Sequence, residues 1–213
     1  MISIVIPTLN EAAQLPLTLE KIRANSAAHE IIVADGGSAD ATLQIADAAG
    51  AKVVCSPERR RSSQLNLGAT VARGDTLLFL HADTQLQNFS LIQIEDALKN
   101  EGVVGGGFAR RFDSDSMFLR FTCGLAMWRC ICFGWFLGDQ GIFVRRDTFN
   151  HLGGFREMNM FEDVDFSRRM SRMGKVRTLR PGVVSSARRF QTHGAVGRTC
   201  RDFWLTCRYV AGK

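Results

Sequence analysis

Acidic and hydroxyl side chains follow three short apolar runs of the sequence, each at the point where the run ends. Thr8 and Glu11 follow the first run, Asp35 the second and Asp83 the third. The third run, residues 76–80, is apolar enough for a strand that is buried on both faces. Carboxylate oxygens suit a hard divalent cation, which usually binds together with a substrate phosphate. The alternative for Asp83 is a structural role as the cap of a following helix.

A second acidic group is found further along, where Glu162, Asp163 and Asp165 fall within four positions. Adjacent carboxylates repel each other, which raises the pKa of one of them and suits it to general-base chemistry. We therefore expect Glu162 and Asp163 to be catalytic. The alternative is that acids at the start of a helix only stabilise its dipole, and Asp165 could instead pair with an arginine of the same helix.

Basic residues gather after another predicted strand, at Arg188, Arg189 and His193. Guanidinium groups bind phosphate oxygens in pairs, so the two arginines suit a phosphorylated ligand. His193 adds a nitrogen that could bind a metal, although a histidine in such a position is more often an ordinary surface residue. Arg61 begins a predicted helix near the same edge of the sheet, and its alternative is a solvated run of charge with the two arginines before it.

The composition limits the class of protein. With 213 residues, 46% of them hydrophobic and 23% charged, the chain fits one soluble globular domain. Its net charge of +6 favours an anionic partner: nucleotide phosphates, nucleic acid or an acidic membrane surface. Six cysteines lack the paired spacing of a zinc site, and the first residues read directly as a strand rather than a leader. We therefore expect a cytoplasmic protein with reduced thiols.

Strand and helix patterns alternate through the first hundred residues, which indicates an α/β fold with a mainly parallel central sheet flanked by helices. The carboxyl ends of parallel strands meet at one edge of a sheet, so the polar residues after the strands should converge on one crevice. The predicted strands cover residues 3–6, 30–34, 51–55 and 76–80, and the predicted helices cover 10–24, 40–49, 61–72 and 89–100.

The second half of the chain is less regular. We expect a helix over residues 163–173 and strands over 103–112, 141–145, 176–179 and 183–187. Residues 138–141 form a polar turn suited to binding an acceptor.

The aromatic stretch at residues 117–137 has two interpretations. Phe118, Phe121, Leu125 and Trp128 have helical spacing, so we favour a role in the core. Alternatively, the stretch and the tail could dock on an anionic bilayer through their arginines and tryptophans.

Two common nucleotide sites are excluded by their missing loops. A dinucleotide-binding fold needs a glycine-rich turn after its first strand, where this chain has Pro-Thr-Leu-Asn-Glu. A phosphate-binding loop with Gly-Lys-Ser or Gly-Lys-Thr is also missing from the sequence. The remaining option is a nucleotide held by carboxylates and a metal.

The order of these motifs resembles that of family 2 glycosyltransferases, which have the GT-A nucleotide-diphospho-sugar transferase fold. The resemblance covers nearly the whole chain, and residues of the helix before the fourth strand also fit it: Asn66, Gly68, Ala69, Ala72 and Gly74. Three segments are similar to a bacterial subfamily associated with arsenosugar biosynthesis: residues 80–84, 138–143 and 186–190.

The resemblance implies an inverting transfer of a sugar from a UDP- or GDP-linked donor to an acceptor hydroxyl. Asp163, next to Glu162, would be the general base, and Asp83 with His193 would bind Mg²⁺ or Mn²⁺. The acceptor would be a small molecule or a lipid-linked one, and nucleic acid would not be a partner. The residues that would bind the donor are Thr8, Glu11, Asp35, Arg61, His81, Arg188 and Arg189.

The chain departs from the family pattern at His81, where the family usually has the first acid of an Asp-x-Asp motif. Losing this negative charge puts tight metal binding in doubt. Two rival functions stay open. One is a peripheral membrane or interaction protein with a degenerate glycosyltransferase fold, in which His81 marks lost catalysis. The other is a sugar-phosphate nucleotidyltransferase, which also needs a nucleotide, a metal and an acidic cluster.

The expected layout is a single domain over residues 1–213. Within it we expect a nucleotide-binding half at 1–100, an acceptor and catalytic half at 101–196, and an amphipathic tail at 197–213.

Overall fold

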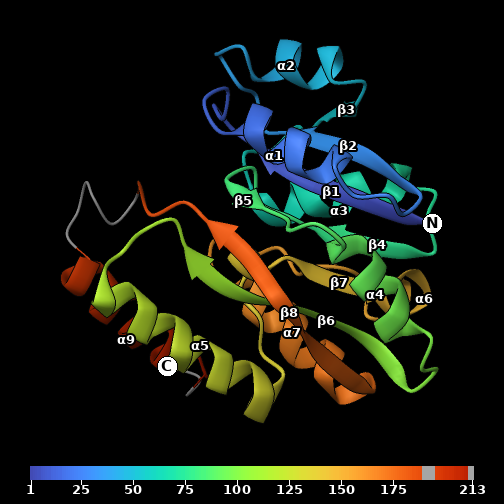
Figure 1. The fold of residues 1–213 in the computed structure, drawn as a ribbon. Coiled ribbons are helices and arrows are strands. Elements are labelled where there is room, and N and C mark those ends of the chain that lie inside the picture. The colour runs from blue at the N-terminus through green and yellow to red at the C-terminus, as the bar shows by residue number, and fades with distance from the viewer. Residues whose placement is uncertain (189–194, 211–213) are drawn as a thin grey trace.

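One mixed sheet runs through the computed structural model, which describes residues 1–188 and 195–210 (Figure 1). Within these residues the sheet has eight strands in the order 3-2-1-4-7-6-8-5. The strands are β1 (Ile2–Thr8), β2 (His29–Asp35), β3 (Lys52–Cys55), β4 (Thr76–Phe79), β5 (Thr84–Gln85), β6 (Val103–Phe112), β7 (Ile142–Arg145) and β8 (Lys175–Ser185).

The first four long strands pair as the sequence predicts, because β1 is parallel to both β2 and β4, and β2 is parallel to β3. The second half adds antiparallel pairs to a sheet that is still mainly parallel, as predicted, since β6 is also parallel to β8. β7 is antiparallel to both β4 and β6, and β5 is antiparallel to β8, so the sheet is mixed. The reason is that β7 starts from a turn that already lies at the carboxyl edge, η1 (Gly138–Gln140), and must run away from that edge.

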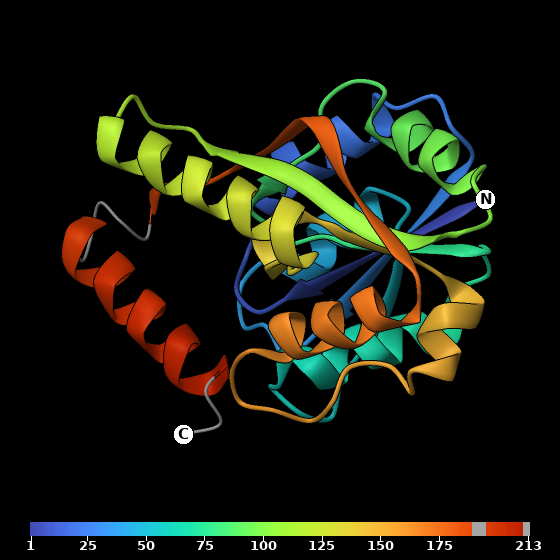
Figure 2. The same ribbon diagram turned by 90° about the horizontal axis from the view of Figure 1, so that it is seen from below.

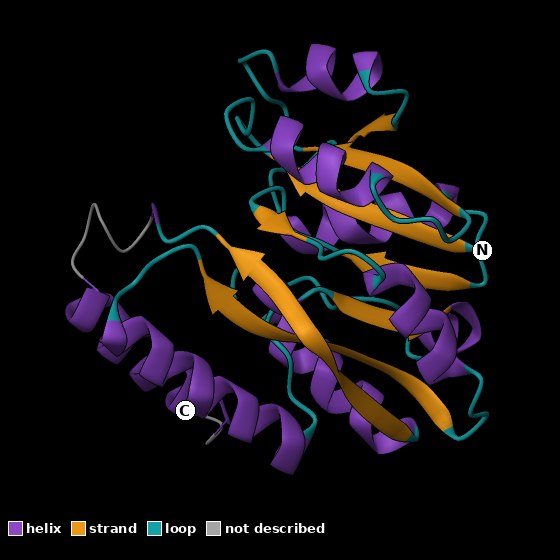
Figure 3. Cartoon of the chain, in the orientation of Figure 1, coloured by secondary structure: helices purple, strands orange, loops and turns teal. Residues whose placement is uncertain are grey.

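Helices cover both faces of the sheet (Figures 2 and 3). Side chains of α1 (Leu15–Arg23), α2 (Thr42–Ala48) and α4 (Ser90–Leu98) belong to one apolar cluster. Those of α3 (Arg61–Val71), α6 (Arg146–His151) and α7 (Glu162–Met173) belong to the other. Two further helices, α5 (Met117–Phe133) and α9 (Ala195–Val210), lie along one side of the molecule (Figures 1 and 2).

The central strands are buried on both faces, as the sequence predicts. In β4, Leu78 packs into the cluster on one face, while Leu77 and Phe79 pack into the cluster on the other. All three side chains are buried, so β4 carries the residues that follow it on a rigid support.

Several predicted boundaries shift for local reasons. The helix predicted from residue 10 begins at Leu15, because Asn10 has a left-handed backbone with φ of 55° that breaks the chain direction after β1. The two strands predicted at 176–179 and 183–187 are one strand, β8, which pairs with β6 along most of its length. The short helix α6 is missing from the prediction.

The core interpretation of the aromatic stretch is wrong for three of its four residues. Phe121, Leu125 and Trp128 are exposed, and α5 instead buries Leu119, Ala126 and Cys130. The helix is apolar on both sides, so helical spacing alone could not tell which side packs on the protein.

Candidate active site

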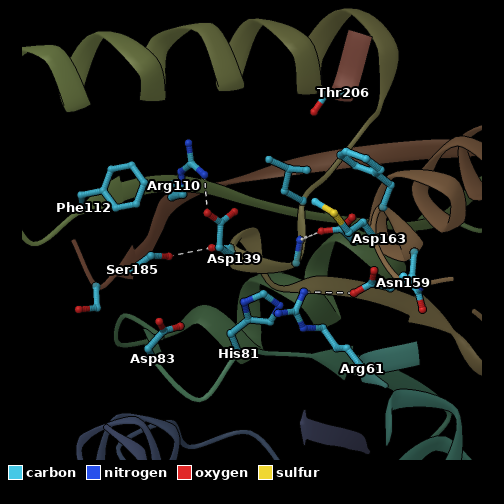
Figure 4. Close-up of a pocket in the computed structure, with 16 residues that line it drawn as sticks. Arg61, His81, Asp83, Arg110, Phe112, Asp139, Asn159, Asp163, Ser185 and Thr206 are labelled. Carbon is cyan, nitrogen blue, oxygen red and sulfur yellow. Dashed lines mark hydrogen bonds and ion pairs between the residues drawn. The ribbon is translucent and has the colours of Figure 1, made fainter. Parts of the chain in front are cut away.

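A cleft of about 380 Å³ opens at the carboxyl edge of the sheet (Figure 4). Five residues predicted from the sequence line it: Arg61, His81, Asp83, Glu162 and Asp163. They come from the start of α3, the loop after β4 and the start of α7. Of the three strand ends expected to converge on one crevice, only the loop after β4 lines this cleft, which it shares with the start of α7.

The fold raises the pKa of Asp163. Its Oδ2 accepts a hydrogen bond of 2.6 Å from the backbone N–H of Gly138, and its Oδ1 accepts one of 2.7 Å from Val164. Burial, followed by the charge of neighbouring Glu162, raises the pKa of Asp163 to about 6. The expectation that one of the two adjacent acids has a raised pKa is confirmed, and the acid concerned is Asp163.

Glu162 has a different environment from its neighbour. It is buried, and its Oε1 lies 3.2 Å from Nη1 of Arg61, whose side chain reaches across from the first turn of α3. This ion pair fixes the start of α7 against α3 and keeps a negative charge beside Asp163. Glu162 lines the cleft, and its expected catalytic role stays a prediction.

Asp165, the third acid, is structural, as its alternative interpretation predicted. Its Oδ2 lies 2.7 Å from Nε of Arg169, one turn further along α7, and its Oδ1 lies 3.3 Å from Nη1 of Arg156.

Gly138 connects the two sides of the cleft. Its N–H holds Asp163, and a Cβ at this position would come within 2.3 Å of Nε2 of His81. The imidazole therefore packs directly on the backbone of η1, and any larger residue at position 138 would displace it.

Arg110 and Asp139 form an ion pair that the sequence did not predict. Nη1 of Arg110 binds Oδ2 of Asp139 deep in the cleft, and Ser185 donates a hydrogen bond of 2.9 Å to the backbone carbonyl of Asp139 (Figure 4). Burial would raise the pKa of Asp139, but the charges of Arg110 and then His81 outweigh it and lower that pKa. Asp139 was expected only as part of an acceptor-binding turn, and nothing in the sequence paired it with an arginine 29 positions earlier.

Two buried polar atoms of this pair have no partner. Among the described residues, Nε of Arg110 and Oδ1 of Asp139 make no hydrogen bond. An unpaired buried polar atom calls for an explanation, and an ordered water or ion would supply one. Gln140, expected on the same acceptor surface, is instead buried and bonds to Phe108 and Arg129.

Asp83, Arg188 and Glu11 form a chain of charges at one end of the cleft. Nη2 of Arg188 lies 2.7 Å from Oε2 of Glu11 and 3.9 Å from Oδ2 of Asp83. The segment carrying Arg188 is itself tied to the β4 loop, since the N–H of Ser186 donates to the carbonyl of Asp83 at 3.1 Å.

Thr8 and Asp35 pair at the ends of β1 and β2, where they are register partners. Asp35 is fully buried and accepts hydrogen bonds from Thr8 at 2.9 Å, from the backbone of Gly37 at 2.8 Å, and from the backbone and hydroxyl of Ser38. Burial would raise the pKa of Asp35, but these bonds outweigh it and lower the pKa. Asp35 therefore shapes the loop after β2, and neither it nor Thr8 lines the cleft.

The residues present are compatible with a divalent cation that shares its ligands with a substrate. Magnesium usually binds through one or two carboxylates plus substrate phosphates, and Asp83 offers one carboxylate in the cleft. In the described part of the chain, no three His, Cys, Asp or Glu side chains cluster as a complete metal cage. Arg189 and His193, predicted for the donor and the metal, lie outside the described residues.

Comparison with known proteins finds a family model that matches most of the chain. The model of "Glycosyl transferase family 2" matches residues 3–159, about three quarters of the sequence. The chain belongs to this family. The matched region includes Asp35, His81 and Asp83 but ends before Glu162 and Asp163.

A curated relative of this family 2 glycosyltransferase is the PGL/p-HBAD biosynthesis glycosyltransferase Rv2957 of Mycobacterium tuberculosis. The two are 31% identical over 188 residues, covering 78% of this chain and 68% of the relative.

Solved structures share the fold at low identity. The mannosyltransferase PcManGT from Pyrobaculum calidifontis, in complex with GDP-Man and Mn²⁺, matches with a TM-score of 0.72 and 19% identity over 87% of this chain and 56% of that one. S. aureus TarS 1-349 in complex with UDP-GlcNAc matches with a TM-score of 0.71 and 15% identity over 87% of this chain and 58% of that one. The chain thus has the GT-A fold and spans little more than half the length of these structures.

Proposed function

We propose that this family 2 glycosyltransferase moves a sugar from a nucleotide diphosphate sugar to an acceptor hydroxyl. The observation that carries the proposal is Asp163, a carboxylate with a pKa of about 6 in the same cleft as Asp83. The GDP-Man and UDP-GlcNAc complexes of the structural neighbours support a UDP- or GDP-linked donor.

Asp163 would act as the general base. Its raised pKa makes it a better proton acceptor than an ordinary aspartate, while most of it stays ionised at neutral pH. The backbone N–H groups of Gly138 and Val164 each orient one carboxylate oxygen, and each oxygen keeps a second lone pair for the acceptor. Deprotonation of the acceptor hydroxyl would allow a single in-line displacement at the anomeric carbon, with inversion of its configuration.

Arg188 and Asp83 would bind the diphosphate end of the donor. Guanidinium groups bind phosphate oxygens through two parallel hydrogen bonds, and Arg188 is held near Asp83 by backbone contacts of its own segment. Mg²⁺ or Mn²⁺ on Asp83 would neutralise the charge that develops on the departing nucleoside diphosphate. The Mn²⁺ in the structure of PcManGT supports such a metal.

The acceptor would meet the apolar lining of the cleft. Phe112, Leu137, Met160 and Phe161 line the cleft together with the Arg110–Asp139 pair. This mixture of apolar walls and polar atoms suits a hydroxyl on an apolar body, which could be a small molecule or a lipid-linked one. We propose that the enzyme works in the cytoplasm, at the inner face of the membrane if its acceptor is lipid-linked. The likeness to the arsenosugar-associated subfamily stays a prediction.

The test is a calorimetric titration with a panel of UDP- and GDP-linked sugars, with and without Mn²⁺. We expect one donor to bind with a dissociation constant of about 1–100 μM in the presence of the metal. A chain that binds no nucleotide under any condition would instead be a degenerate member of the family. Release of pyrophosphate from a nucleoside triphosphate would favour the sugar-phosphate nucleotidyltransferase.

A further inference from the structure

The outer face of α5 carries a continuous apolar stripe. Met117, Phe121, Leu125, Trp128 and Ile131 follow one another at steps of three or four residues, and their exposed fractions lie between 54% and 76%. Steps of this size place all five side chains on one side of a helix. A contiguous exposed patch of this kind marks an interaction site rather than ordinary surface.

The opposite side of α5 already packs on the protein. Leu119, Ala126 and Cys130 are buried there, and Arg129 on the same side donates to Gln140 and to the carbonyl of Trp135. A helix that is apolar on both sides needs both sides to be shielded from water. Among the described residues, only the inner side of α5 packs on the rest of the protein.

The charged side chains of α5 are both arginines, Arg120 and Arg129, whereas α9 carries Asp202 beside its own arginines. α5 contains no acidic residue, and Arg120 is exposed on the edge of the stripe without an ion pair among the described residues. The neighbouring helix α9 exposes Arg201, and it exposes Arg208 with its guanidinium 4.7 Å above the ring of the exposed Trp204. The nearest acids in the sequence, Asp113 and Asp115, precede α5.

We infer that the outer face of α5, with Trp204 and Arg208 of α9, docks the enzyme on an anionic lipid bilayer. Apolar side chains flanked by arginines and tryptophans are the pattern of a helix that lies in the membrane interface. A second copy of the chain fits less well, because a two-fold contact through this face would bring the arginines of both copies together. In the described part of the chain no helix has the length and hydropathy to span a bilayer, so the helix would lie flat.

The docking face and the cleft are close to each other. Phe112, the last residue of β6 and five residues before the start of α5, lines the cleft, and Thr206 of α9 lines it as well. Phe112 also lines a second hollow of about 620 Å³ beside Leu119 and Arg120. An acceptor held in the bilayer would therefore have a short path to the site.

Vesicle cosedimentation tests this inference, using the full chain with phosphatidylcholine vesicles and with vesicles of which about one third is phosphatidylglycerol. We expect wild type to bind the anionic vesicles about tenfold better than the neutral ones at low salt. The double variant Phe121→Ser with Trp128→Ser should lose about tenfold in binding. The matched control is Leu17→Ser, which changes an exposed leucine of α1 and should bind like wild type.

Three outcomes would overturn the inference: no binding to either vesicle, equal binding by the double variant, or a wild-type dimer in sedimentation velocity that this variant dissociates. The last would assign the face to a protein contact. Donor affinity should be the same in wild type and variant, and the docking result stands independently of sugar transfer.

Discussion

Arg188 donates two hydrogen bonds from Nη2 to Glu11, at 3.0 Å to Oε1 and 2.7 Å to Oε2. The two residues are 177 positions apart, so this contact ties the end of the sheet to the loop after β1. The same nitrogen is 3.9 Å from Asp83. Without a ligand, Arg188 thus neutralises two carboxylates that we expect to serve the donor and its cation.

Replacing Arg188 should weaken donor binding. Arg188→Gln removes the charge that would contact the diphosphate, and we expect the donor affinity to fall about tenfold or more, since hydrogen bonds to charged groups contribute about 1.5–3 kcal/mol. Arg188→Lys should recover only part of the loss because an ammonium cannot bind two oxygens in parallel. Calorimetry measures both, with the exposed Arg172→Gln as control. Equal affinity in Arg188→Gln and wild type would rule out the contact.

Restoring an acid at position 81 should strengthen cation binding. His81→Asp adds a second carboxylate near Asp83, and we expect Mn²⁺ to bind about tenfold tighter in the presence of the nucleoside diphosphate. Asp83→Asn should weaken Mn²⁺ binding. A chelator should abolish the effect of Mn²⁺ on the wild-type protein. Electron paramagnetic resonance of free Mn²⁺ gives the affinities. Identical affinities in all three proteins would show that the cation does not bind here.

The features of this site that could be predicted from the sequence are those caused by residues that are neighbours in the chain. Asp83 could be placed because an apolar strand and the acid after it are adjacent in the chain, and the raised pKa of Asp163 follows in part from its neighbour Glu162. The Arg110–Asp139 pair and the Arg188–Glu11 contact join distant segments, which no spacing reveals. The exposed side of α5 was given only as the alternative interpretation, because both sides of the helix are apolar and only tertiary packing selects one.

The stability of the protein should depend on pH through Asp163. Its pKa is about 6 in the folded protein, above the ordinary 3.8 of an aspartate, so the folded state binds the proton more tightly than the unfolded state. The contribution of protonated Asp163 to the free energy of unfolding is therefore fully present below about pH 4 and is lost as the pH rises to about 6. Asp163→Asn should be more stable than wild type by about 1–3 kcal/mol at pH 8 and equally stable near pH 4. Urea unfolding at the two pH values checks this; a variant less stable than wild type at pH 8 would contradict it.

Breaking the Arg110–Asp139 pair should destabilise the fold. The Arg110 side chain is only 10% exposed, so Asp139→Asn leaves a buried charge without its partner, at a cost of about 3–5 kcal/mol. Asp147→Asn, at an exposed position of α6, is the control and should change the free energy of unfolding by less than about 0.5 kcal/mol. Equal unfolding free energies for the two variants would mean that Asp139 does not compensate Arg110.

The central claim is that Asp163 accepts the proton of the acceptor hydroxyl. The measurement is made on Asp163→Asn with the donor that the titration identifies, following donor affinity by calorimetry and sugar transfer by release of the nucleoside diphosphate. We predict an affinity within about threefold of wild type and a transfer rate lower by about 10²–10⁴-fold, the usual contribution of a general base. A variant that transfers sugar at the wild-type rate would contradict the account.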